Sequence, residues 1–205
     1  MRRTSALALI VLLAACSGGG GDDEARPEPQ ISEQAFEVPE IDLEVTRSEY
    51  VSPHQERGVL PEATAREALD VVQALFDATV VDAAVRGEPG DATTLFTPDA
   101  LERLRGRDYR AFVDDGVGPV ETLEAERARV GLAGLADENN EPALVVAAID
   151  WDVRSPDGTV RITRAGELSL VPAGPGGAWR IAAYSIVTER TVDGSTTTTT
   201  AEAGS

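Results

Sequence analysis

A hairpin signal at Ser155-Pro156-Asp157-Gly158 constrains the fold more than any other stretch of this sequence. Asp-Gly is a dipeptide that two-residue hairpin turns prefer, because both positions of such a turn need positive φ angles. Alternating apolar residues flank the signal, and a register shifted by one residue would turn all of them to the opposite face. The predicted pairs are Val153 with Ile162, Trp151 with Arg164, Ile149 with Gly166 and Ala147 with Leu168.

The same alternation extends over residues 120–190, with further turn signals at 137–142 and 172–177. The later turn predicts that Leu170 pairs with Trp179, Leu168 with Ile181 and Ile162 with Val187. Asp150 and Asp152 share the outer side of their strand, where we expect them to pair with Arg161 across the hairpin. This part of the chain is therefore predicted to be a four-stranded antiparallel meander.

Before residue 120 the apolar residues recur with helical spacing. Thr64 and Glu67 have the spacing of a capping box, and Gly87 supplies a stop signal. Polar side chains occupy one narrow stripe of this helix, so we expect the sheet to wrap around it. A shorter helix is predicted from Thr97-Pro98 to Leu104, with one more turn at 109–113. The predicted fold class is α+β, with a long N-terminal helix and short helices wrapped by a curved four-stranded antiparallel meander over residues 60–192.

The amino end has the order of a cleavable export signal, with Arg2 and Arg3 before an apolar run that is too short to span a bilayer. Its last residues, Leu13-Ala14-Ala15-Cys16, resemble the bacterial lipobox. That resemblance implies a signal peptide over residues 1–15 and diacylglycerol bound covalently to Cys16, with no other cofactor. The expected location is the extracytoplasmic face of the cell membrane, where the lipid is the anchor.

Two segments are predicted to be disordered. Residues 16–59 are rich in acids and prolines and are interpreted as a stalk. Within it Ile41, Leu43 and Val45 alternate, so a short edge strand is the alternative there. Residues 193–205 contain five consecutive threonines and read as a tail. Across the chain 36 acids face 18 basic residues, a net charge of −18, which argues against nucleic acid as a partner.

Element order and two short stretches, Phe96-Thr97-Pro98-Asp99 and Gly177-Ala178-Trp179-Arg180-Ile181, resemble the nuclear transport factor 2-like superfamily. The chain also resembles helper proteins associated with the mammalian-cell-entry lipid transporters. The superfamily resemblance covers residues 60–192. It implies a cone-shaped domain with a pocket at its open end and a sheet whose outer face often forms a dimer.

The pocket candidates are polar residues at positions where the pattern calls for apolar ones, together with a neighbouring tryptophan. They are Asp82, Arg86, Trp151, Arg164 and Ser185. Together they would line the mouth of the cone and hold an anionic or amphipathic ligand. The alternative, which we favour, is that Asp82 pairs with Arg164 or Arg86, because a charge that leaves water needs a partner.

An enzyme of the isomerase or cyclase type is the less favoured alternative, with Asp82 as base beside Tyr109 or Tyr184. No motif assigns these roles, so no catalytic residue and no metal site is predicted. The second face of the sheet is also apolar, so we expect it to be covered. The cover is either a homodimer or envelope protein partner, or the N-terminal stalk or short helices of the same chain. The candidate interface residues are Leu144, Val146, Tyr184 and Ile186.

The expected protein is thus a membrane-anchored extracytoplasmic lipoprotein whose non-catalytic domain binds a protein partner or a small amphipathic ligand. An accessory ligand carrier of a lipid transporter is a further alternative.

Overall fold

The computed structural model describes residues 38–53, 55–104, 108–114, 116–174 and 177–203. The predicted signal peptide and Cys16 lie outside the described residues. The helices are α1 (Glu62–Phe76), the π-helix η1 (Asp77–Val81), α2 (Asp82–Arg86), the 3-10 turn η2 (Thr93–Leu95), α3 (Pro98–Arg103) and α4 (Tyr109–Phe112). The strands are β1 (Glu44–Ser52), β2 (Gln55–Gly58), β3 (Glu124–Ala136), β4 (Pro142–Arg154), β5 (Val160–Pro172), β6 (Trp179–Val192) and β7 (Ser195–Ala203).

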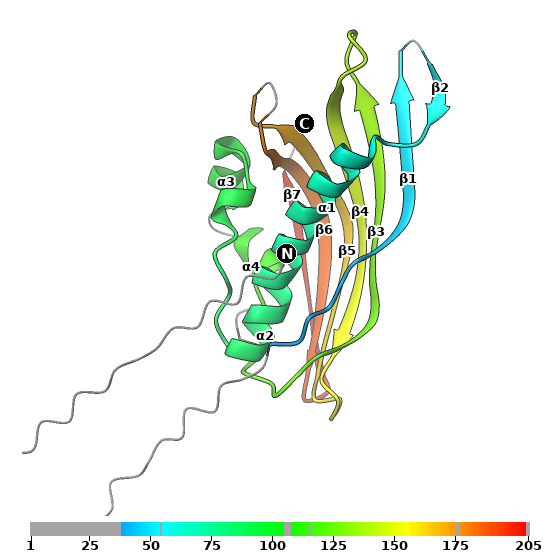
Figure 1. The fold of residues 1–205 in the computed structure, drawn as a ribbon. Helices are drawn as coiled ribbons and strands as arrows, with labels where there is room; N and C mark the ends of the chain where they lie inside the picture. Colours follow the sequence, from blue (N-terminus) through cyan, green and yellow to red (C-terminus); the bar gives the residue numbers. More distant parts are fainter. Residues whose placement is uncertain (1–37, 54, 105–107, 115, 175–176, 204–205) are drawn as a thin grey trace, which may run out of the picture. The chain divides into compact units, whose positions relative to one another are not determined.

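All seven of these strands form one sheet, in the order β2-β1-β3-β4-β5-β6-β7. The predicted fold class is therefore wrong. The described chain is mainly a mixed seven-stranded sheet with a single helical run of 25 residues, and the four-stranded antiparallel meander is only its centre. The sheet is mixed because β1 pairs with β3 in parallel, whereas the other neighbours are antiparallel. Figure 1 shows α1 lying along one face of this curved sheet.

The two outer regions of the sheet come from segments that we expected to be disordered. β1 lies within the predicted stalk, and β7 within the predicted tail. Most side chains of both strands are exposed, so their composition resembles that of a solvated chain. Their stability comes instead from backbone pairing with β3 and β6, which needs no apolar side chain on the outer face.

The central hairpin has the predicted register. Trp151 pairs with Arg164 and Ile149 with Gly166, and the other two predicted pairs are also present. Ile149 and Leu168 are 4% and 0% exposed, so both face the same buried side of the sheet. The predicted register is therefore present, but the turn differs from the expected two-residue type. Gly158 has a positive φ of 73° whereas Asp157 does not, and the backbone N–H of Ser155 donates to the carbonyl of Val160 at 2.9 Å.

The register between β5 and β6 differs from the prediction in two ways. At the turn, Trp179 pairs with Pro172 and not with Leu170, a shift of two residues that leaves the sides of the strand unchanged, and beyond it β6 contains a bulge. Leu170 pairs with Ile181 and Ser169 with Ala183, which leaves Ala182 as an extra residue on β6. A single extra residue reverses the inward and outward sides of the strand beyond it. After the bulge, Leu168 pairs with Tyr184, which was expected to point outward and is instead buried.

The helical run begins and ends close to the expected residues. Pro61 is the N-cap of α1 and makes no side-chain capping bond, so the predicted capping box at Thr64 is wrong and Thr64 lies inside the helix. Gly87 ends α2 with a φ of 72°, a left-handed conformation that glycine adopts without strain. Downstream, Thr97 caps α3 as predicted, by accepting a hydrogen bond from the backbone N–H of Ala100.

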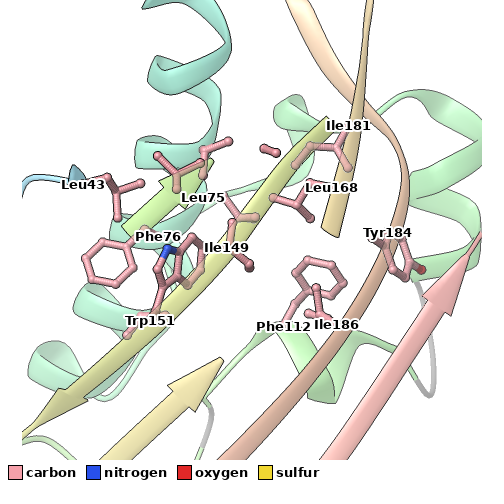
Figure 2. Close-up of a cluster of buried hydrophobic side chains, with 14 of the residues drawn as sticks. Leu43, Leu75, Phe76, Phe112, Ile149, Trp151, Leu168, Ile181, Tyr184 and Ile186 are labelled. Carbon is pink, nitrogen blue, oxygen red and sulfur yellow. The ribbon is translucent and has the colours of Figure 1, made fainter. Parts of the chain in front are cut away.

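The core lies between the helical run and the inner face of the sheet. Figure 2 shows Leu75 and Phe76 of the helical run beside Ile149 and Trp151 of β4. The rings of Phe76 and Trp151 meet edge to face, with 4.9 Å between their centroids. Further aromatic rings, of Phe96, Phe112 and Tyr184, fill the space under α3 and α4.

A substitution at Gly166 tests how closely β5 approaches β6. The φ of this glycine is 149°, and a Cβ there would lie 2.1 Å from the carbonyl oxygen of Ser185. Gly166→Ala is expected to lower the free energy of unfolding by about 3 kcal/mol or more, since the backbone has to move. Urea denaturation measures the loss.

Gly158→Ala is the matched control, because Gly158 also has a positive φ, of 73°, but no atom lies within 4 Å of its added Cβ. We expect it to cost about 1 kcal/mol. Equal losses in the two variants would contradict the close approach of the two strands.

Candidate functional site

The structure does not bring the five predicted pocket residues together. Trp151 and Arg164 are neighbours, with the guanidinium carbon 5.7 Å from the indole centroid, but they are only 1% and 0% exposed. Asp82 instead pairs with Arg86 on α2, at 3.3 Å. Ser185 is exposed on the opposite face of the sheet. The bulge at Ala182 precedes it in β6 and reverses the side to which the following residues point. The predicted ligand site is therefore absent from the described inner side of the sheet.

Arg164 is the centre of a fully buried polar network. Its Nη2 donates to Oδ2 of Asp114 at 2.8 Å, and its Nη1 donates to the hydroxyl of Thr79 at the same distance. Nε donates to the hydroxyl of Thr188 at 3.0 Å. Thr79 lies in the π-helix η1 and itself donates to the carbonyl of Leu75.

Asp114 is shared by a second arginine, Arg190 of β6. Nε of Arg190 donates to Oδ1 of Asp114, and Nη1 donates to the hydroxyl of Thr199 at 2.8 Å. Nη2 donates to the backbone carbonyls of Arg110 and Val113 at 2.8 and 3.2 Å. The two arginines thus fasten α4 and the residues after it to the sheet.

Sequence reasoning found Arg164 but missed Asp114 and Arg190. Asp114 follows a predicted helical turn with no period to mark it as buried. Arg190 was not a candidate, and the bulge that turns it toward the core was not predicted. Burial lowers the pKa of Arg164, and the carboxylate of Asp114 acts in the opposite direction.

The residues considered for catalysis are also separated. Tyr109 is 41% exposed on α4, whereas Tyr184 is buried and donates its hydroxyl to Asp108 at 3.2 Å. Burial, followed by the negative charge of Asp108, raises the pKa of Tyr184. Neither tyrosine makes a described hydrogen bond to Asp82. The part of the chain that the structure describes contains no group of three metal-ligating side chains that could hold an ion.

The predicted interface is divided between the two sides of the sheet. Leu144 and Val146 are half-buried and alternate with the buried Val145, as expected for the outer face. Tyr184 and Ile186 were predicted to lie beside them but are 3% and 1% exposed in the core. On the same outer face Asp152 accepts hydrogen bonds from Arg161, the predicted cross-hairpin pair.

A surface cleft of about 620 Å³ lies where α1 begins, beside two turns of the sheet. We call it the acidic cleft, and its lining includes Glu67, Asp137, Glu141, Pro142, Pro172 and Trp179. Backbone N–H groups of Glu141 and Asn139 donate to Asp137 and lower its pKa, so its carboxylate stays ionised near neutral pH. Glu67 and Glu141 are exposed. Three carboxylates beside apolar walls suit a cationic group that carries an apolar part.

The comparisons add no relative from which a role could be transferred. No family model matches the chain, and neither curated proteins nor solved structures include a similar one. Among the described residues, no helix is both long and apolar enough to cross a membrane.

A substitution at Asp114 tests how much the buried network stabilises the fold. Asp114→Asn removes the carboxylate that two guanidinium groups share, and we expect the free energy of unfolding to fall by about 4 kcal/mol. Asp152→Asn is the matched control. The Asp152 side chain is also only 1% exposed, but its partners Arg127 and Arg161 are 41% and 55% exposed.

Because those two partners can turn to water, the control should lose only about 1 kcal/mol. Urea denaturation of both variants gives the comparison. A loss in Asp114→Asn no larger than in the control would show that the fold does not depend on the network.

Proposed function

We propose that this protein is a lipid-anchored lipoprotein on the extracytoplasmic face of the cell membrane, with a non-catalytic domain that binds a cationic amphipathic ligand or a basic segment of a partner protein. The observation that carries the binding part is the acidic cleft, in which Glu67, Asp137 and Glu141 lie beside apolar residues. The net charge of −18 also attracts cations to the surface over a Debye length of about 8 Å at physiological salt.

The anchor is proposed from the sequence. Leu13-Ala14-Ala15-Cys16 ends the apolar run as in a lipobox, and Cys16 is the only cysteine of the chain. A thioether-linked diacylglycerol places two acyl chains in the bilayer, which suffice for stable attachment.

A non-catalytic role is favoured because the polar groups of the interior bind one another. Arg164 and Asp114 are both fully buried and form an ion pair, and Tyr184 donates its hydroxyl to Asp108. Groups held in this way stabilise the fold and are not presented to a substrate. The resemblance to the nuclear transport factor 2-like superfamily remains a proposal.

Replacing the cysteine tests the anchor. Cys16→Ser removes the thiol that would carry the lipid, so we expect the protein to move from the membrane fraction to the soluble fraction of cells. Mass spectrometry of the wild-type protein should show the added mass of diacylglycerol. A wild-type chain with an unmodified Cys16 would contradict the proposed anchor.

Glu67→Gln combined with Glu141→Gln tests the acidic cleft. Both side chains are exposed, so the fold should be retained while the affinity for a short-chain alkyltrimethylammonium probe falls about fivefold. Calorimetry measures the affinity, and native mass spectrometry of detergent-extracted protein shows whether a ligand or partner is retained.

Glu102→Gln combined with Glu124→Gln is the control, because it changes the net charge equally at exposed sites that do not line the described cleft. Equal losses in the two double variants would indicate a general charge effect and would exclude the cleft as the site.

A further inference from the structure

A second cleft lies beside the start of β7 and encloses about 330 Å³. We call it the arginine cleft. Its polar lining comes from Arg110, Arg190, Ser195, Thr197 and Thr199, and Val117 and Val192 add apolar surface. No acid belongs to its described lining. A cleft lined by two arginines and no described acid is unusual in a chain with twice as many acids as bases.

The buried network beside this cleft contains more positive than negative charge. Arg164 and Arg190 share a single carboxylate, that of Asp114, and all three side chains are at least nine-tenths buried. Among the residues that the structure describes, Arg190 has no acidic partner besides Asp114, and Arg110 has no acidic partner. Because buried charges need neutralisation, the surplus charge lies where Arg190 borders the cleft.

Arg190 also has a hydrogen available for a ligand. Its Nη1 carries two hydrogens, and within the described chain Thr199 Oγ1 is the only acceptor of this nitrogen. The hydroxyls of Ser195, Thr197 and Thr199 line the same cleft, because alternate residues of a strand share one face. The Thr199 hydroxyl itself donates to the carbonyl of Thr188 at 3.5 Å. The guanidinium of Arg110, the remaining hydrogen on Nη1 of Arg190 and the hydroxyls of Ser195 and Thr197 still give more donors than the two oxygens of a carboxylate require. They suit a tetrahedral oxyanion.

We propose that the arginine cleft binds a phosphate group, either as free phosphate or as the phosphodiester of an anionic phospholipid headgroup. The site lies apart from the acidic cleft, and the proposal does not rest on the function proposed above. It gives the threonine run a role, since Thr197 and Thr199 face the ligand while Thr198 lies on the opposite side of β7.

Calorimetric titration of the full chain, purified in a non-ionic detergent, with inorganic phosphate tests the site. Arg110→Ala should weaken binding about tenfold, because an exposed guanidinium that bonds to an anion is lost without a change in the core. Arg66→Ala is the charge-matched control on the exposed face of α1, and it should leave the affinity unchanged.

A second pair of variants uses adjacent residues of one strand. Thr197→Val removes a hydroxyl that lines the cleft and should weaken binding about threefold. Thr198→Val makes the same change on the other side of β7, opposite Glu189, and should have no effect. Because valine and threonine both favour strands, neither change should disturb β7.

Titration with a short-chain phosphatidylglycerol, with phosphatidylcholine as control, distinguishes the two sources of phosphate. Binding of inorganic phosphate that Arg110→Ala weakens supports a site for free phosphate. Binding of phosphatidylglycerol alone, with the same dependence on Arg110, supports a headgroup site. The proposal is overturned if neither probe binds at millimolar concentration, or if Arg110→Ala and Thr197→Val bind as well as their controls.

Discussion

The carboxylate of Asp114, held between two arginines, is the interaction on which the two layers of this domain depend. Through Arg164 it connects to the π-helix after α1, and through Arg190 to the edge strand β7. A buried carboxylate is costly unless it is paired, and both of its oxygens are paired here. The same three charges fill the space in which the sequence predicted a ligand, and the two proposed binding clefts lie at the rim of the sheet.

The sequence predicted the elements whose signals are local. Asp157-Gly158 determined one hairpin, and Gly87 and Thr97 ended and began helices where the structure has them. A comparable signal for β7 was present and was missed. Asp193-Gly194 has φ angles of 47° and 79°, as a two-residue hairpin turn needs, and β-branched threonines follow it. The threonine run was interpreted by its low complexity when its strand propensity was the better guide.

The remaining differences depend on contacts that a local pattern does not contain. An extra Ala182 in β6 reversed the sides of the residues that follow it. This removed Ser185 from the predicted pocket, and Tyr184 and Ile186 from the predicted interface. The pairing of β4 with β5 contains no register shift, so Trp151 and Arg164 were placed together correctly. Asp114 became a candidate only once the fold showed which loop packs against Arg164.

The parallel pairing of β1 with β3 has a consequence for the order in which the chain can fold. Glu44 and Arg129 are 85 residues apart, so β1 leaves the ribosome long before its partner exists. Closing that loop costs about 3 kcal/mol more than closing the two-residue turn before β7. β1 should therefore join the sheet late, and its row of charged side chains would keep the waiting segment from pairing with another nascent chain.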